Sequence, residues 1–303
     1  MHEAQGGDTY QSTQRYLFAV AYRMTGSAND AEDLVHDAWL RYLDAGSPAV
    51  NSLRAYLTTI VSRLALDYLK SARVQREQYI GSWMPEPVLT AEAVPGPAET
   101  AEQREEVSYA LLMLLEQLTP EQRIVYVLRE GFGLSYDEIA QHVSKSAAAC
   151  RQVFHRAQRI RITGKPRPIL PAAEHLQVVE QFLAAFSAGN VAGVASILAA
   201  DAFSLADGGP HRLAARKPIV GRDKVARGLV GWSSKLSADH PLSVEIVDIN
   251  GTPAIVLREG EGIDRVVLFD IRDGRITAVR TMMNPEKLRH LNRRLTGVTG
   301  DLV

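Results

Sequence analysis

The chain has 303 residues, 46% of them hydrophobic and 23% charged, which is the size of two or three domains and the composition of a globular protein rather than a disordered or fibrous one. Its formal net charge of −1 gives no overall sign of a nucleic-acid partner, although an average over several domains can conceal a local basic face. Its apolar runs are far shorter than the roughly 20 residues of a membrane helix and no secretory signal is readable, so we expect a cytoplasmic protein without membrane contact.

The first predicted domain, residues 10–78, is a helical bundle. Its apolar side chains recur at three- and four-residue spacing, with breaks at Thr25-Gly26-Ser27 and Gly46-Ser47-Pro48. A helix over Ala31–Asp44 would bury Ala31, Leu34, Val35, Ala38 and Tyr42 and would expose Asp33, Asp37, Leu40 and Arg41. An exposed acidic stripe with an apolar residue suits a protein partner, while a simply solvated helix face is the alternative.

Residues 79–104 form a predicted acidic linker. Their composition shifts to Pro, Glu, Ala and Thr, and Pro85, Pro87, Pro95 and Pro97 restrict helix formation.

Helical periodicity resumes over residues 105–162, with breaks at Gly131-Phe132-Gly133 and Ser144-Lys145-Ser146. Before the second break, a short helix over Leu134–Val143 has Ser135 and Glu138 at the spacing of a capping box. After it, a helix from about Ala147 would bury Cys150, Val153, Phe154 and Ala157. This arrangement predicts a helix-turn-helix, and a plain helical hairpin is the alternative. Because Cys150 is the only cysteine, we expect no disulfide, and we expect no metal or cofactor.

The outer face of that second helix is basic. No Asp or Glu occurs from Ile139 to Ala173, and the exposed positions are Ala149, Arg151, Gln152, His155, Arg156 and Arg159. Such a helix can enter the major groove of DNA, where Arg and Gln form paired hydrogen bonds with base edges. We predict that Arg151 and Gln152 read bases.

The third domain, residues 174–291, follows a stiff proline-containing linker over residues 163–173 and precedes a tail over residues 292–303. Its pattern predicts helices over Glu174–Ala188 and Asp223–Ser234, then strands over Ser243–Ile249, Ala254–Arg258, Arg265–Ile271 and Arg275–Met282. Asn250-Gly251 and Asp273-Gly274 supply the positive φ that hairpin turns require, so the strands should form an antiparallel meander.

The first two domains resemble known families. Asp30 to Leu40, Leu53 to Leu57 and Arg63 to Lys70 are similar to domain 2 of the RNA polymerase sigma factors. Leu118 to Arg123, Leu134 to Ala140 and Cys150 to Ala157 are similar to sigma domain 4. The order is that of the extracytoplasmic-function type, which implies binding to core RNA polymerase and promoter DNA and a role in transcription initiation.

The resemblance also assigns surfaces. It implies that Asp33, Asp37 and Leu40 dock on the polymerase clamp helices, and that the helix over Ile60–Arg76 meets the −10 element. Unstacked promoter bases attract basic side chains and stack on aromatic ones, which the chain supplies as Arg54, Tyr56, Arg63, Lys70, Arg73 and Arg76. Ordinary helix packing is the alternative for Tyr56 and Tyr68. The −35 element would meet Lys145, Ser146, Ala149, Arg151, Gln152, His155 and Arg156.

The third domain resembles the SnoaL-like superfamily, and the domain order is similar to that of sigma-J-type factors. Three short segments carry this likeness: Trp83-Met84-Pro85-Glu86-Pro87, Asp207-Gly208-Gly209 and Asn284-Pro285-Glu286-Lys287-Leu288. Pro210 and His211 depart from the third glycine and the lysine that commonly continue the glycine-rich loop. The likeness implies regulation in cis through Trp83, Pro85, Glu86, Pro87, Asp207, Gly208, Gly209, Asn284, Pro285 and Lys287, whereas plain turns are the alternative from residue chemistry.

No catalytic residue is predicted. Asp207, His211, His240 and Asp248 are acid or base candidates without a recognisable paired spacing, so a ligand-sensing or structural role is favoured over catalysis. A small molecule of unknown identity is the partner that such a sensor would take. The expected fold is therefore multidomain: two all-α sigma domains, the second with a helix-turn-helix, and an α+β SnoaL-like cone with a curved antiparallel sheet. A fused isomerase or cyclase, with the helical domains used only for localisation, and a plain helix-turn-helix repressor are the rival hypotheses.

Overall fold

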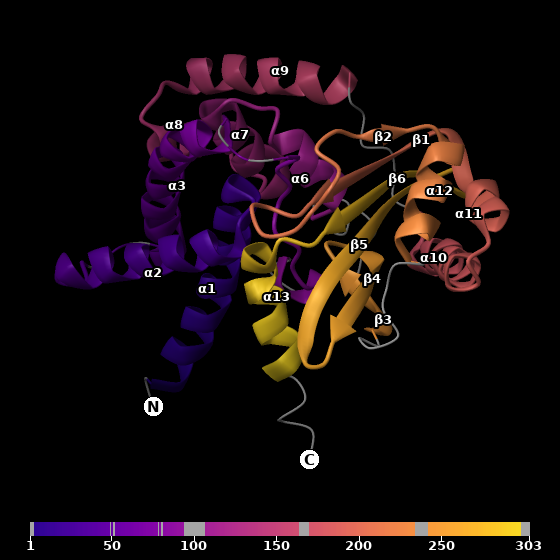
Figure 1. Ribbon diagram of the computed structural model, residues 1–303. Coiled ribbons are helices and arrows are strands. Elements are labelled where there is room, and N and C mark those ends of the chain that lie inside the picture. The colour runs from indigo at the N-terminus through magenta and orange to yellow at the C-terminus, as the bar shows by residue number, and fades with distance from the viewer. Residues whose placement is uncertain are drawn as a thin grey trace. The chain divides into compact units, whose positions relative to one another are not determined.

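The computed structural model describes residues 3–48, 50, 52–77, 79, 81–93, 107–163, 170–233 and 242–297 (Figure 1). The chain divides into two compact units. Unit 1 contains the N-terminal helices up to Gln78 and the helical region from Glu106 to Pro166. Unit 2 contains the segment Tyr79–Thr90 and the region from Arg167 onward. In the part of the chain that is described, no helix is long and apolar enough to cross a membrane.

Unit 1 is helical throughout. Its elements are α1 (Glu3–Thr25), α2 (Ala28–Asp44), α3 (Leu53–Glu77), α6 (Tyr109–Leu115), α7 (Pro120–Tyr126), the π-helix η1 (Val127–Gly131), α8 (Tyr136–Val143) and α9 (Ala147–Thr163). Gly26 and Gly46 end the first two helices with φ of 71° and 77°, at the predicted breaks. Capping boxes at Thr119 and Ser135 start α7 and α8, so the predicted helix start is confirmed.

Buried polar contacts join the first three helices to the later ones within unit 1. The Arg123 side chain is 2% exposed; its Nε donates to the Arg23 carbonyl oxygen at 3.0 Å, and its guanidinium pairs with Glu116. Arg23 Nη1 donates to the Gly131 carbonyl oxygen at 3.0 Å. Thr59 Oγ1, on α3, is hydrogen bonded to His142 Nδ1, on α8, across 2.7 Å. Within unit 1, the two predicted helical domains are therefore in direct contact with each other.

Unit 2 is an α+β domain built on a six-stranded sheet. Its helices are α10 (Ala172–Ser187), α11 (Val191–Ile197), α12 (Arg222–Ser233) and α13 (Pro285–Gly297). Its strands are β1 (Leu198–Asp207), β2 (Ile219–Val220), β3 (Leu242–Ile249), β4 (Thr252–Glu259), β5 (Gly262–Arg272) and β6 (Arg275–Met282), in the spatial order β2-β1-β6-β5-β4-β3. In Figure 1, α10, α11 and α12 lie together beside the sheet.

The predicted antiparallel meander is confirmed, and two strands that were not predicted, β1 and β2, extend it into a mixed sheet. β3, β4, β5 and β6 pair antiparallel in sequence order, with φ of 49° at both Asn250 and Asp273 in the connecting turns. β1 pairs parallel to β6, which makes the sheet mixed. The alanine-rich run of β1 has little strand propensity, and its partner lies about 75 residues later, so local pattern did not reveal it.

The core of unit 2 fills one face of this sheet. Phe182 of α10 and Val225 of α12 pack with Phe269 and Val279 from the central strands. The last helix, α13, buries Leu288 and Leu291 and continues to Gly297, past the predicted domain end at residue 291. The sheet and its helices thus form the frame for the sites described next.

Candidate functional site

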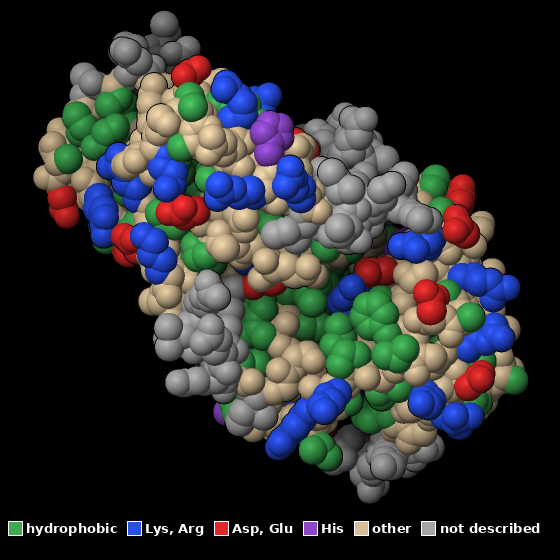
Figure 2. Space-filling view, turned by 90° about the horizontal axis from the view of Figure 1, so that it is seen from above, with side chains coloured by type: hydrophobic (Ala, Val, Ile, Leu, Met, Phe, Trp, Pro, Cys, Tyr) green, Lys and Arg blue, Asp and Glu red, His purple; other side chains and the backbone are tan. Residues whose placement is uncertain are grey.

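The helix-turn-helix places a basic face on the surface. Ser144, at φ 54°, ends α8 and turns the chain into α9. Cys150, Phe154 and Ala157 are buried as predicted, and the exposed side of α9 carries Arg151, Gln152, His155, Arg156 and Arg159. Ala149 and Lys145 are half-buried and Ser146 is exposed. Figure 2 looks onto the face that carries α9 in Figure 1 and shows Lys and Arg side chains gathered on it.

Two contacts fix the start of this basic face. The Arg151 guanidinium lies 5.1 Å from the centre of the Tyr136 ring, and Lys145 Nζ lies 3.2 Å from Glu121 Oε1. These contacts orient the two cations while leaving Arg151 exposed. The helix can therefore present charge and hydrogen-bond donors to a DNA groove.

The acidic stripe on α2 is exposed as predicted. Asp33 and Asp37 are on the surface, and the Leu40 residue is 44% exposed. Ala31, Leu34, Val35 and Ala38 are buried on the opposite side. Tyr42 is only half-buried, because its ring lies at the helix margin, edge-on to Tyr56 at 5.9 Å.

The helix α3 carries a row of cations. Arg54, Arg63 and Lys70 are exposed, and the Arg54 guanidinium lies 4.9 Å from the centre of the Tyr16 ring. Tyr56 is half-buried, and the Tyr68 hydroxyl donates to Asp30 Oδ2 at 2.6 Å, which gives Tyr68 a structural contact. The side chains of Arg73 and Arg76 lie outside the described residues.

Asp207 is the centre of a buried polar cluster within unit 2. Its Oδ1 accepts hydrogen bonds from the Tyr79 hydroxyl at 2.6 Å and from the Gly209 N–H at 3.1 Å. Its Oδ2 accepts from the Met84 N–H at 2.9 Å and from Lys287 Nζ at 2.7 Å. One carboxylate at the end of β1 thus holds both the segment Tyr79–Thr90 and helix α13.

Lys287 and Asn284 complete this cluster. Lys287 Nζ also donates to the Met84 carbonyl oxygen at 2.6 Å and lies 4.2 Å from the centre of the Trp83 ring. Asn284 Nδ2 donates to the Tyr79 hydroxyl oxygen at 2.8 Å. Burial and the adjacent Asp207 carboxylate raise the pKa of Tyr79, so its hydroxyl keeps the proton that it donates. Pro85, Glu86 and Pro87 are buried, whereas Pro285 is exposed at the start of α13.

The two glycines after Asp207 have no room for a side chain. A Cβ on Gly208 would lie 2.4 Å from the Arg212 carbonyl oxygen. A Cβ on Gly209, which has φ of 57°, would lie 2.5 Å from Asn284 Nδ2. Glycine is therefore required by close approach at both positions, beyond the needs of a simple turn.

A second anchor on the same segment was not predicted. The Asn250 N–H donates to the Val88 carbonyl oxygen at 3.0 Å, and the Val88 N–H donates to Asn250 Oδ1 at 3.1 Å. The Thr90 hydroxyl donates to Asp248 Oδ1 at 3.0 Å and accepts from the Gly251 N–H at 2.8 Å. The Asn-Gly pair signalled only a hairpin turn, so its second role had no local sequence signal. We name the segment Tyr79–Thr90 with its two anchors the linker clamp.

The acid and base candidates all have structural contacts or lie outside the described residues. Asp207 and Asp248 belong to the linker clamp, and His211 pairs with Glu286 on the surface across 3.3 Å. His240 is not described, and neither are residues 94–104 of the predicted linker, which include Pro95 and Pro97. Within the described ranges, no three His, Cys, Asp or Glu side chains are grouped as metal ligands.

Two family models match the helical part of the chain: Sigma-70 region 2 over residues 9–74 and Sigma-70, region 4 over residues 108–159. The ECF RNA polymerase sigma factor SigJ of Mycobacterium tuberculosis is 34% identical over 287 residues, which cover 92% of this chain and 91% of SigJ. The chain belongs to the ECF RNA polymerase sigma factors. This sigma factor is also 32% identical to the probable ECF RNA polymerase sigma factor SigI of the same organism, over 95% of this chain and 96% of SigI.

The likeness extends to the three-dimensional structure. The crystal structure of the M. tuberculosis extracytoplasmic function sigma factor SigJ matches with a TM-score of 0.73 at 31% identity, over 92% of this chain and 96% of that chain. The matches confirm the predicted order of regions 2 and 4, and the C-terminal domain is an α+β domain with a mixed sheet. As a sigma factor, the protein directs core RNA polymerase to promoters and is not an enzyme.

Proposed function

We propose that the C-terminal domain regulates this sigma factor in cis through the linker clamp. The observation that carries the proposal is the saturated Asp207 carboxylate, which accepts four hydrogen bonds, two of them from the segment Tyr79–Thr90. That segment lies between α3 of region 2 and α6 of region 4. A domain that grips the connection between two promoter-reading regions controls how far apart they can move.

The linker clamp acts by limiting the distance that regions 2 and 4 can span between the two promoter elements. Elements centred at −10 and −35 are separated by about 25 base pairs, or roughly 80 Å along B-form DNA. In unit 1, α3 contacts α8 through Thr59 and His142, so this closed arrangement must open before both elements are read. An open connection of about 30 residues spans about 100 Å when extended. Fixing Tyr79–Thr90 to unit 2 shortens that reach.

We also assign a binding partner to each group of surface residues. Asp33, Asp37 and Leu40 dock on core polymerase, because an exposed acidic stripe with an apolar residue suits a protein partner. Arg54, Tyr56, Arg63, Lys70 and Arg73 attract and stack the opened −10 strand. Lys145, Ser146, Ala149, Arg151, Gln152, His155 and Arg156 meet the −35 element. Each assignment can be tested by single substitutions in a reconstituted holoenzyme.

The test is transcription with core polymerase on a promoter library. Asp207→Asn is compared with wild type, with the exposed-turn control Asp273→Asn, and with a chain truncated near Thr163. Release of the clamp is expected to raise promoter activity in Asp207→Asn while association with core polymerase is unchanged. Equal transcription by wild type and Asp207→Asn counts against cis control. Failure of wild type and of the truncated chain to bind core polymerase counts against the assigned docking surface.

A further inference from the structure

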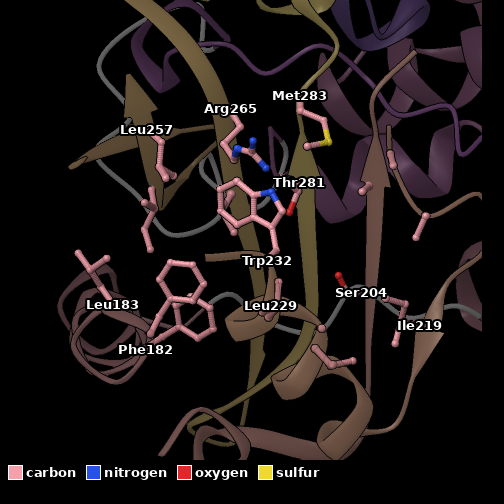
Figure 3. A pocket seen from close by; sticks show the side chains of 18 of the residues that line it. Phe182, Leu183, Ser204, Ile219, Leu229, Trp232, Leu257, Arg265, Thr281 and Met283 are labelled. Carbon is pink, nitrogen blue, oxygen red and sulfur yellow. The ribbon is translucent and has the colours of Figure 1, made fainter. Parts of the chain in front are cut away.

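Unit 2 contains a cavity of about 200 Å³ between the sheet and the helices α10 and α12. Phe182, Leu183 and Phe186 of α10, Leu229 and Trp232 of α12, and Leu257 of β4 form much of its wall. Figure 3 shows Phe182 and Leu183 at one side of this space and Arg265, Trp232 and Thr281 grouped at another. An apolar cavity of about 150 Å³ holds benzene, so this one has room for a somewhat larger ring system.

One wall of the cavity carries a buried cation. The Arg265 side chain is 8% exposed, its Nε donates to Asp264 Oδ2 at 2.5 Å, and its guanidinium carbon lies 3.5 Å from the centre of the Trp232 ring. Within the described part of the chain, neither terminal nitrogen of Arg265 has a hydrogen-bond acceptor. A guanidinium has five N–H donors, so the four on the terminal nitrogens of Arg265 have no acceptor among the described residues.

Among the described residues, the charge around Arg265 is not balanced. Asp264 is the carboxylate partner of both Arg265 and Arg212, so two guanidinium groups share one negative charge. Among the described residues that line the cavity there is no Asp or Glu. Burial lowers the pKa of Arg265, which reflects the cost of keeping this cation away from water. An anionic group in the cavity would supply the missing negative charge.

Two hydroxyl groups add hydrogen-bonding capacity to the cavity, and Figure 3 shows Thr281 beside Arg265 and Ser204 away from it, near Ile219. Ser204 of β1 and Thr281 of β6 line the cavity and are about 8% exposed. Among the described residues, no side chain is hydrogen bonded to either hydroxyl. A cation and a hydroxyl group side by side in an otherwise apolar space are typical of a small-molecule site.

We propose that this cavity binds a small hydrophobic carboxylic acid, with its carboxylate on the terminal nitrogens of Arg265 and its ring or chain among Phe182, Leu229 and Leu257. A planar carboxylate matches the two outward N–H groups of a guanidinium in a bidentate pair. The hydroxyl of Thr281 lies beside Arg265 and donates to the acid, whereas Ser204 lines another part of the cavity. The site is separate from the cis control proposed above and stands or falls without it.

The test is isothermal titration calorimetry of the full chain. The probes are 2-naphthoate, benzoate and octanoate, each paired with its neutral primary amide. We expect one molecule of carboxylate per chain and at least about tenfold tighter binding of the best carboxylate than of its amide, because the charge-assisted pair is lost in the amide. No binding of any of the three carboxylates, or equal affinity for acid and amide, overturns the proposal.

Three variants locate the site. Gly228 of α12 lines the cavity and has room for a side chain, since an added Cβ would lie 3.6 Å from Ile219 Cδ1. Gly228→Leu should fill the cavity and abolish binding, whereas Gly231→Leu, on the same helix with open space around it, should bind as wild type does. Arg265→Met should remove the preference for the acid, with its Tm measured alongside. Unchanged binding by Gly228→Leu or by a folded Arg265→Met overturns the proposal.

Discussion

Substitution of Asp207 by Asn is the sharpest perturbation of the linker clamp, because it replaces one carboxylate oxygen by an NH₂ group and removes the negative charge with almost no change in volume. The carboxylate accepts from four donors on its two oxygens, and an amide has only one oxygen to offer. The amide NH₂ group must then face either the donors Tyr79 and Gly209 or the donors Met84 and Lys287. In either orientation the NH₂ group faces two buried donors, which then have no acceptor at this side chain.

The free-energy cost of Asp207→Asn follows from the buried ion pair that the substitution breaks. The Asp207 side chain is 0% exposed and that of Lys287 is 10% exposed, and loss of one member of such a pair costs about 3–5 kcal/mol. Lys287 keeps the Met84 carbonyl and the rings of Trp83 and Tyr79, so the lower figure of about 3 kcal/mol applies. The population with a released segment should therefore rise about a hundredfold.

Native-state proteolysis measures that release. Chymotrypsin cleaves after Tyr79 and Trp83 only when the segment leaves unit 2, so the cleavage rate reports the open population. Asp207→Asn should be cleaved about a hundredfold faster than wild type. The matched control is Asp273→Asn at an exposed turn with φ of 49°, which Asn tolerates, and it should be cleaved at the wild-type rate.

A double-mutant cycle separates charge from shape. Lys287→Met removes the ammonium group that Asp207→Asn leaves without its carboxylate, so the double variant should be less affected than the sum of the two single variants. Strictly additive effects, or a cleavage rate of Asp207→Asn equal to that of wild type, would refute the reasoning that one buried carboxylate holds the segment.

Three further outcomes are expected. Burial lowers the pKa of His142, so the unfolded chain binds more protons than the folded chain near pH 6. The stability of unit 1, measured by urea denaturation, should therefore fall as the pH drops through about 6.5, and it should fall more steeply in wild type than in His142→Gln. Gly208→Ala should destabilise unit 2 by about 1–3 kcal/mol in the same assay because its Cβ meets the Arg212 backbone, whereas Gly231→Ala on an open helix face should not. Arg151→Ala in the holoenzyme should weaken binding to a −35 duplex by about 1–3 kcal/mol relative to a scrambled duplex, whereas Arg159→Ala should weaken both duplexes equally.

Local chemistry in the sequence accounts for the elements that were predicted correctly. The capping box of Ser135 and Glu138, the Asn250-Gly251 turn and the spacing of Cys150, Phe154 and Ala157 each act over a few residues. Strand β1 escaped prediction because Ala-rich runs carry no strand signal and its pairing with β6 is distant in sequence. The family likeness pointed to Asp207, Lys287 and Asn284, but their partner Tyr79 had no signal of its own.

Pairings across long sequence separations account for the rest of the site. Thr90 and Asp248 are 158 residues apart, and Val88 and Asn250 are 162 residues apart. No local periodicity encodes such contacts, and each side chain at these positions has an ordinary local explanation. The buried Arg265 was predicted only as the first residue of a strand, since alternation along a strand says which face is inward but not that a cavity lies there.

Strand β1 connects the two proposed sites, and its alternation also lets them be tested apart. Ser204 and Ala206 face the cavity, whereas Asp207, the next residue, faces the linker clamp. Met283 lines the cavity, and its N–H donates to the Asp207 carbonyl oxygen at 2.8 Å, so the two sites share backbone. Gly228 lies on α12, away from this shared backbone. A cavity filled by Gly228→Leu should therefore leave chymotrypsin cleavage of the clamp unchanged, whereas Asp207→Asn alters cleavage and leaves Arg265 in place to bind an acid.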